Sequence, residues 1–145
     1  MSVYLDTSVL VRWYILEAGS KVAVALRAKI KSPIPLSPFH RVEMTAACRL
    51  KVFRGELDHI VATQALNDFQ TEVEAGLFAP VELGFAAVCK RAELLANVYS
   101  DRLGMRTLDV MHVASALELK YREFITADAR QGELAKACRL KVTQL

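Results

Sequence analysis

The chain has 145 residues, of which 53% are hydrophobic and 24% are charged, and its formal net charge is +3. This length is enough for one domain with a buried core, and the composition excludes a disordered chain. The small positive charge permits a polyanionic partner without requiring one. We find no internal repeat or linker, so residues 1–145 are expected to form a single domain.

Cysteines and apolar runs indicate where the protein resides. Cys48, Cys89 and Cys138 are odd in number and widely spaced, which favours free thiols in a reducing compartment over a disulfide framework. The apolar run at residues 9–16 is interrupted by Arg12 and is too short to span a membrane. The start of the chain lacks the basic leader of a signal peptide. A cytoplasmic protein with no membrane association is therefore expected.

Strands and helices alternate along the chain. Apolar periodicity and turn residues predict strands at residues 2–6, 34–36, 78–83, 123–126 and 140–142. Helices are predicted from residue 9 and over residues 21–29, 38–53, 57–74, 84–99, 107–117 and 129–139, with a polar loop at 100–106. This order predicts an α/β fold whose parallel sheet is covered on both faces.

The first predicted strand ends in Asp6, which Thr7 and Ser8 follow. Ligands of open α/β sheets gather beyond the carboxyl ends of the strands, so Asp6 is a candidate site residue. Asp, Thr and Ser are also preferred helix N-cap residues, and the local alternative is that these three only begin the next helix.

Glu43 lies in the helix predicted over residues 38–53. At 3.6 residues per turn it falls among the apolar side chains of one face, which are Phe39, Ala46, Ala47 and Leu50. A carboxylate on such a face is costly unless it is partnered. The alternative interpretation is that Glu43 pairs with Arg54 or sits at the rim of the packing.

Two more acids occupy the second half of the chain. Asp109 falls in the first turn of the apolar helix over residues 107–117, where the helix dipole alone would favour an anion. Asp128 follows the strand at 123–126 and, with Gln131, also fits a local capping pair. His112 is interpreted as a hydrogen-bonded core histidine rather than a ligand.

Four acids at strand ends or inward positions require a compensating cation. No cysteine or histidine cluster provides a soft-metal site, and carboxylate oxygens suit Mg²⁺ or Mn²⁺. Mg²⁺ is usually shared with substrate phosphates, and a bound metal lowers the pKa of water and stabilises a leaving oxygen. Phosphodiester hydrolysis is the chemistry that these residues favour.

Four segments that carry the acids occur in order along the chain, namely Val3-Tyr4-Leu5-Asp6-Thr7-Ser8, Val42-Glu43, Thr107-Leu108-Asp109-Val110-Met111-His112-Val113-Ala114 and Thr126-Ala127-Asp128. They resemble the motifs of the PIN-domain nucleases, and the short length of the chain resembles the toxin ribonucleases of bacterial and archaeal VapBC toxin–antitoxin modules. The resemblance implies an α/β/α sandwich with a central parallel sheet, and Mg²⁺-dependent endoribonuclease activity. It also implies homodimers and a VapB-like antitoxin partner.

The same resemblance assigns roles to residues. It implies that Asp6, Glu43, Asp109 and Asp128 form the catalytic, metal-binding site. Thr7, Ser8 and Thr126 stand beside these acids in the motifs and are expected to support them or to contact substrate.

RNA must reach an acidic site, so positive charge is expected beside it. Arg41, Arg49, Lys51 and Arg54 lie on the helix that carries Glu43, and Arg102 and Arg106 precede Asp109. The alternative is an ordinary solvated helix face.

Other functions remain open at this point. A non-toxin PIN nuclease of RNA processing would share the four acids. An inactive nucleic-acid or protein interaction module would share the fold. An aspartate-nucleophile phosphohydrolase is disfavoured, because that chemistry needs a second acid two residues after Asp6, where Ser8 stands.

Overall fold

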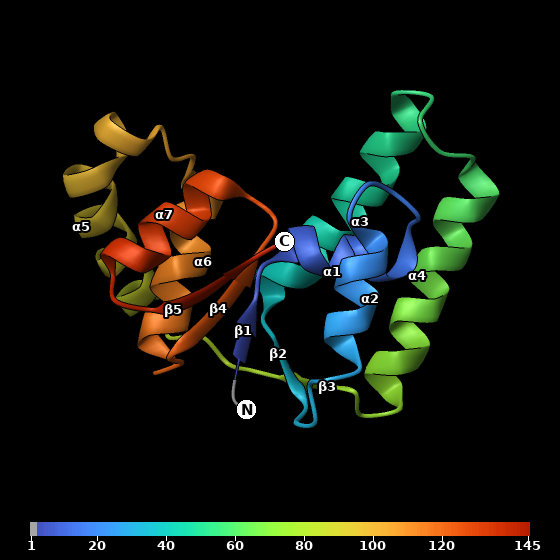
Figure 1. The fold of residues 1–145 in the computed structure, drawn as a ribbon, viewed down its shortest axis with the longest axis horizontal. Coiled ribbons are helices and arrows are strands. Elements are labelled where there is room, and N and C mark those ends of the chain that lie inside the picture. The colour runs from blue at the N-terminus through green and yellow to red at the C-terminus, as the bar shows by residue number, and fades with distance from the viewer. Residues whose placement is uncertain (1–2) are drawn as a thin grey trace. The chain divides into compact units, whose positions relative to one another are not determined.

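The computed structural model describes residues 3–145 and has a mixed α/β fold (Figure 1). The strands are β1 (Val3–Leu5), β2 (Ile34–Leu36), β3 (Phe78–Pro80), β4 (Glu123–Thr126) and β5 (Lys141–Gln144). The helices are α1 (Thr7–Tyr14), α2 (Ser20–Arg27), α3 (Pro38–Phe53), α4 (His59–Glu74), α5 (Phe85–Leu103), α6 (Thr107–Glu118) and α7 (Ala129–Ala137). All strand pairs between residues 3 and 145 are parallel, which confirms the predicted fold class. Ser2, predicted to begin the first strand, lies outside the described residues.

The chain packs into two compact units. Unit A is residues 7–81, and unit B combines residues 3–6 with residues 82–145, so the chain passes from B to A between Asp6 and Thr7. Unit A holds the two-stranded sheet β2-β3, and unit B holds the three-stranded sheet β1-β4-β5. The predicted parallel strands therefore form two separate sheets, one in each unit.

Unit B places β4 between β1 and β5. Tyr4 and Leu5 of β1 pair with Phe124 and Ile125 of β4, and all four side chains are buried. Such continuous apolar runs are typical of parallel strands covered on both faces. Helix α7 packs on β4 and β5, and α6 packs against α5 and α7 (Figure 1). Every residue of α6 from 110 to 116 is buried, as the sequence predicted for a central helix.

Unit A is built around helix α3, which packs beside α4 and α1 (Figure 1). Ser37 caps α3 by accepting from the backbone N–H of His40, and Pro38 occupies the first turn. The prediction that α3 buries the face with Phe39, Ala46, Ala47 and Leu50 was wrong. The buried side chains are His40, Met44 and Cys48, and Leu50 is 45% exposed.

The contact between Ser37 and His40 explains why α3 buries a different face from the one predicted. The Nδ1 atom of His40 accepts a hydrogen bond from the Ser37 backbone N–H (3.0 Å), which gives this buried ring nitrogen a partner. The buried stripe therefore runs through histidine and cysteine, at a spacing of four residues, rather than through the alanines. Glu43 lies at the edge of this face and is partly buried.

Several boundaries differ from the prediction. Helix α1 begins at Thr7 rather than residue 9, α2 ends at Arg27 rather than 29, α4 begins at His59 rather than 57, and β3 ends at Pro80 rather than 83. Helix α5 continues through residues 100–103, which were expected to be loop, and ends at Gly104, whose φ of 66° is left-handed and costs a glycine little. Helix α7 ends at Ala137, before Arg139 adopts a φ of 64°. Between residues 3 and 145, no helix is both long and apolar enough to traverse a bilayer. All three cysteines are free, and Cys48 is buried.

Candidate active site

Asp6 lies at the carboxyl end of β1, next to the end of β4. Its backbone N–H donates to the carbonyl of Ile125 (2.9 Å), which extends the β1–β4 ladder by one residue. This parallel register brings Asp6 level with Thr126, and the Thr126 hydroxyl donates to Asp6 Oδ2 (3.1 Å). Both residues are buried. The expected position of Asp6 at the carboxyl end of the first strand is confirmed.

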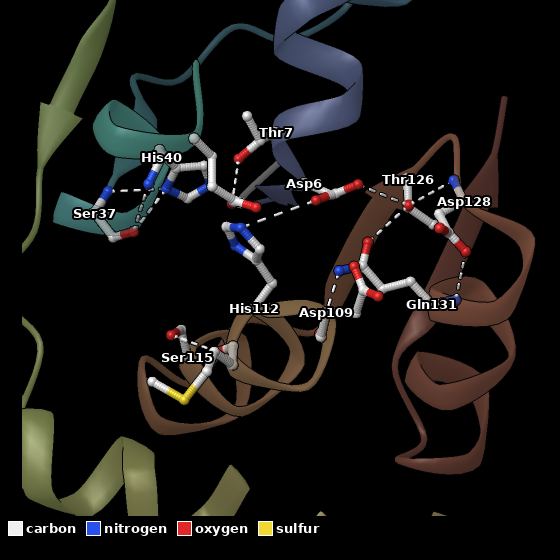
Figure 2. A network of polar contacts seen from close by, with 12 residues as sticks. Asp6, Thr7, Ser37, His40, Asp109, His112, Ser115, Thr126, Asp128 and Gln131 are labelled. Atoms are coloured by element: carbon white, nitrogen blue, oxygen red, sulfur yellow. Dashed lines mark hydrogen bonds and ion pairs between the residues drawn. The ribbon is translucent and has the colours of Figure 1, made fainter. Parts of the chain in front are cut away.

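Asp128 follows Thr126 and begins helix α7. Its backbone N–H donates to Thr126 Oγ1 (2.9 Å), while its Oδ1 accepts from the backbone N–H groups of Arg130 (2.9 Å) and Gln131 (3.1 Å). The local alternative for Asp128, helix capping, is thus observed. Figure 2 shows Thr126 between Asp6 and Asp128, so one hydroxyl connects the two acids.

Asp109 stands in the first turn of α6. Its Oδ2 accepts from Arg106 Nε (3.3 Å), and its side chain is 21% exposed, against 9% for Asp6. The carboxylate therefore has more solvent access than that of Asp6. Its backbone carbonyl accepts from Gln131 Nε2 (3.2 Å), which ties the start of α6 to α7.

Gln131 was expected only as the capping partner of Asp128. Its backbone N–H does cap, but its fully buried side chain extends from Asp109 toward β4, where Oε1 accepts from the Thr126 hydroxyl (2.8 Å). Figure 2 shows this side chain between Asp109 and Thr126. The contact with Asp109 joins residues 22 positions apart, so no local signal predicted it.

His112 is a hydrogen-bonded core residue, as predicted. Its Nδ1 lies 2.8 Å from the Tyr4 hydroxyl, its ring meets Tyr4 edge-on, and the residue is 1% exposed. Its other ring nitrogen, Nε2, lies 4.0 Å from Asp6 Oδ1. The histidine therefore stands behind Asp6, in a layer that the sequence did not assign to the site.

Glu43 and the two hydroxyl residues after Asp6 belong to unit A. The Thr7 hydroxyl donates to Glu43 Oε1 (2.9 Å), and Ser8 is the second residue of α1. Thr7 directly follows Asp6 in the chain, and its side chain contacts Glu43.

The predicted RNA-binding side chains of α3 differ in how their charge is balanced. Lys51 pairs with Glu17 (2.7 Å) and Glu56 (3.6 Å), and the hydrogen bond that Lys51 donates to Glu17 raises the pKa of Lys51 above its usual value. Arg41 and Arg49 instead donate to neutral oxygens of α4, on Gln70 and Thr63. Neither arginine forms an ion pair within residues 3–145.

A further basic side chain lies beside the acids of unit B. Arg130 follows Asp128 and directs Nη1 to the Gly104 carbonyl, in the loop before α6 (3.5 Å). The sequence gave no reason to select it, because only the packing of α7 beside that loop brings Arg130 near the segment that carries Arg106.

The donor set fits a hard divalent cation in kind. The acids of unit B offer carboxylate oxygens, and Mg²⁺ commonly takes only one or two carboxylates, with water and phosphate completing its shell. Within residues 3–145, no group of three or more His, Cys, Asp or Glu side chains is assembled as a metal site. The fit is therefore one of donor chemistry, not of an assembled cage.

Comparison with known proteins gives the family. A model of the PIN domain matches residues 3–137, so the chain belongs to the PIN domain family. This confirms the resemblance that the motifs indicated. No curated protein matches the sequence significantly.

Two solved structures share the fold. FitAcB from Neisseria gonorrhoeae superposes with a TM-score of 0.64 and 17% identity, over 98% of this chain and 96% of that chain. VapBC-1 from nontypeable Haemophilus influenzae gives 0.63 and 16%, over 99% and 98%. Their agreement covers nearly the full length of the chain.

Proposed function

We propose that this PIN-domain protein is a metal-dependent endoribonuclease and the toxin of a toxin–antitoxin pair. The observation that carries the proposal is the pairing of β1 with β4, which sets Asp6 beside the Thr126–Asp128 turn within a chain that the PIN model spans. Family membership supports nuclease activity. Cleavage of RNA and dependence on Mg²⁺ or Mn²⁺ are the finer parts of the proposal.

Each acid has a role in it. Asp6 and Asp109 are the principal metal ligands, and Asp128 acts through its second oxygen, since Oδ1 is committed to the α7 N-terminus. Glu43 is the fourth acid, as the family resemblance implies, and Thr7 orients it by hydrogen bonding. When bound, the ion would lower the pKa of a water molecule and stabilise the leaving oxygen.

Other residues of the chain orient the acids and attract the phosphates of the substrate. The buried hydroxyl of Thr126 holds Asp6 in one orientation, and the partly exposed Asp109 faces solvent from which substrate arrives. Arg106 and Arg130 supply positive charge for phosphates near these acids. Arg41, Arg49 and Lys51 of α3, with Arg54 at its C-cap, form a second candidate contact surface.

An antitoxin partner is proposed on the same grounds. A protein named VapBC-1 is among the similar structures, and the chain resembles the toxins of such modules. An arginine of the antitoxin would neutralise the acids, because a guanidinium pairs bidentately with carboxylates. Homodimerisation is proposed from the family resemblance alone, and a cytoplasmic location from the free cysteines.

RNA cleavage by the purified chain tests the enzymatic proposal. We expect loop or single-stranded RNA to be cut with Mg²⁺ or Mn²⁺, and not with excess chelator. Asp6→Asn should abolish cleavage, whereas Asp101→Asn, at an exposed acid of the same unit, should leave it intact. Full activity in chelator, or full activity of Asp6→Asn, would refute the proposal.

Expression in bacterial cells separates a toxin from a processing enzyme. Induction of the wild-type chain should arrest growth, and Asp6→Asn should not. A chain that cuts RNA in vitro but leaves growth unchanged would point to the non-toxin alternative.

A further inference from the structure

We infer that Gln131 is a positioning residue that sets the metal-binding geometry of Asp6 and Asp109. The inference rests on the proposed function and concerns a side chain that neither the motifs nor the family match selects. Gln131 contacts Asp128 through its backbone N–H and Asp109 through Nε2, and it reaches Asp6 through the Thr126 hydroxyl, which donates to its Oε1.

The orientation of the Gln131 amide follows from its partners. The Asp109 carbonyl can only accept a hydrogen bond, so the amide nitrogen must face it, and the amide oxygen must then face Thr126. The side chain is fully buried, so it cannot exchange these partners for water. It therefore fixes the distance between the start of α6 and the end of β4.

The Thr126 hydroxyl transmits this constraint to Asp6. A hydroxyl has one proton, yet Thr126 Oγ1 lies within donor distance of Gln131 Oε1 (2.8 Å) and Asp6 Oδ2 (3.1 Å). The backbone N–H of Asp128 occupies the acceptor side of the same oxygen. Gln131 thus holds in place the hydroxyl that orients Asp6 Oδ2.

This arrangement favours cation binding by Asp6, because hydrogen-bonded partners that orient a ligating carboxylate support its metal affinity. At the same time, the amide anchors the backbone of Asp109. Loss of Gln131 should therefore weaken metal binding in two ways, by freeing the Thr126 hydroxyl that orients Asp6 and by loosening the start of α6.

Manganese affinity, measured from the electron paramagnetic resonance signal of free Mn²⁺, tests the inference without relying on cleavage. Gln131→Met keeps the length of the side chain and removes both hydrogen bonds. Residues that orient metal ligands typically change affinity about 10- to 100-fold when mutated, and we expect a rise in Kd of that order. Leu134→Val, a buried change one turn further along α7, should retain the wild-type Kd.

If Gln131→Met does not fold, two substitutions of Thr126 test the same hydrogen-bonded connection between Gln131 and Asp6. Thr126→Val removes the shared proton and should raise the Mn²⁺ Kd, whereas Thr126→Ser keeps the hydroxyl and should restore it. A wild-type chain that binds Mn²⁺ and cuts RNA, with Gln131→Met binding equally tightly, would overturn this inference alone. A folded wild-type chain that binds no Mn²⁺ would overturn the proposed metal site with it.

Discussion

The Thr126 hydroxyl donates to Asp6 Oδ2 across two neighbouring parallel strands, although 120 residues separate them in sequence. The contact exists because Leu5 pairs with Ile125, so the residue after each pair reaches the same edge of the sheet. An acid and a hydroxyl that are each unremarkable in sequence thereby form one buried polar unit.

Replacement of that hydroxyl should destabilise the fold. Thr126→Val removes the three hydrogen bonds to Asp6, Gln131 and the Asp128 backbone, and buried polar groups that lose a partner cost about 1 to 3 kcal/mol. We expect Thr126→Ser to retain most of the free energy of unfolding. Urea denaturation of both variants measures the difference, and equal stability of Thr126→Val and wild type would contradict the expected cost.

The contact between Tyr4 and His112 predicts a tautomer. If Nε2 carries the proton toward Asp6, Nδ1 is left to accept from the Tyr4 hydroxyl, which matches the 2.8 Å distance and the 4.0 Å separation from Asp6. Nitrogen NMR of the imidazole should show the Nε2–H form. Tyr4→Phe should cost about 1 kcal/mol of stability. A dominant Nδ1–H tautomer would refute this arrangement.

Tyr14 gives unit A an alkaline sensitivity. Burial raises the pKa of Tyr14 far above its usual value, and its hydrogen bond to Glu72 adds to the shift. The unfolded chain ionises this tyrosine near pH 10 while the folded chain keeps the proton, so stability falls as pH rises above about 10. The loss is at most about 1.4 kcal/mol per pH unit.

Tyr14→Phe removes the group that titrates. Its unfolding free energy should therefore decline less steeply than that of wild type between about pH 10 and about pH 11. Glu72 keeps its pair with Arg27 (2.5 Å) in this variant, so the comparison isolates the phenol. Parallel declines of the two proteins in urea titrations would show that Tyr14 is not the source.

Much of the fold followed from local signals. The apolar run of β1 and the Ser37-Pro38 pair before α3 each predicted an element that the structure contains. The inward face of α3 was misplaced, because His40 enters the core only once its ring is satisfied by Ser37, a contact that hydrophobic periodicity does not count. Polar residues 100–103 looked like loop, but Gly104 rather than polarity ends α5.

The candidate site was predictable only in part. Asp6 could be identified because it ends a buried strand, and parallel strands share an edge. Asp128 fitted both a cap and a ligand, and its local hydrogen bonds to α7 were correctly anticipated. Gln131 and Arg130 could not be selected, because their partners Asp109 and Gly104 lie more than twenty residues away.

Salt-dependent RNA binding tests the two basic surfaces, at Arg130 in α7 and at Arg49 in α3, one at a time. In an Asp6→Asn background, which removes cleavage, Arg130→Ala should weaken RNA binding and reduce the dependence of log K on log salt by about one unit. Arg49→Ala tests the surface on α3 in the same way. Lys136→Ala is the control on α7, since Lys136 pairs with Glu133 at 2.9 Å. An unchanged salt dependence in Arg130→Ala would exclude it as a phosphate contact.

Asp6 and Asp109 are proposed to hold the divalent ion, and the Mg²⁺-induced shift in melting temperature measures their part in binding it. An ion that binds only the folded chain adds about 2.7 kcal/mol at a hundredfold excess over its Kd, which raises the melting temperature by several degrees. The shift should be large in wild type and Asp101→Asn, and nearly absent in Asp6→Asn and Asp109→Asn. Equal shifts in all four proteins would contradict the claim.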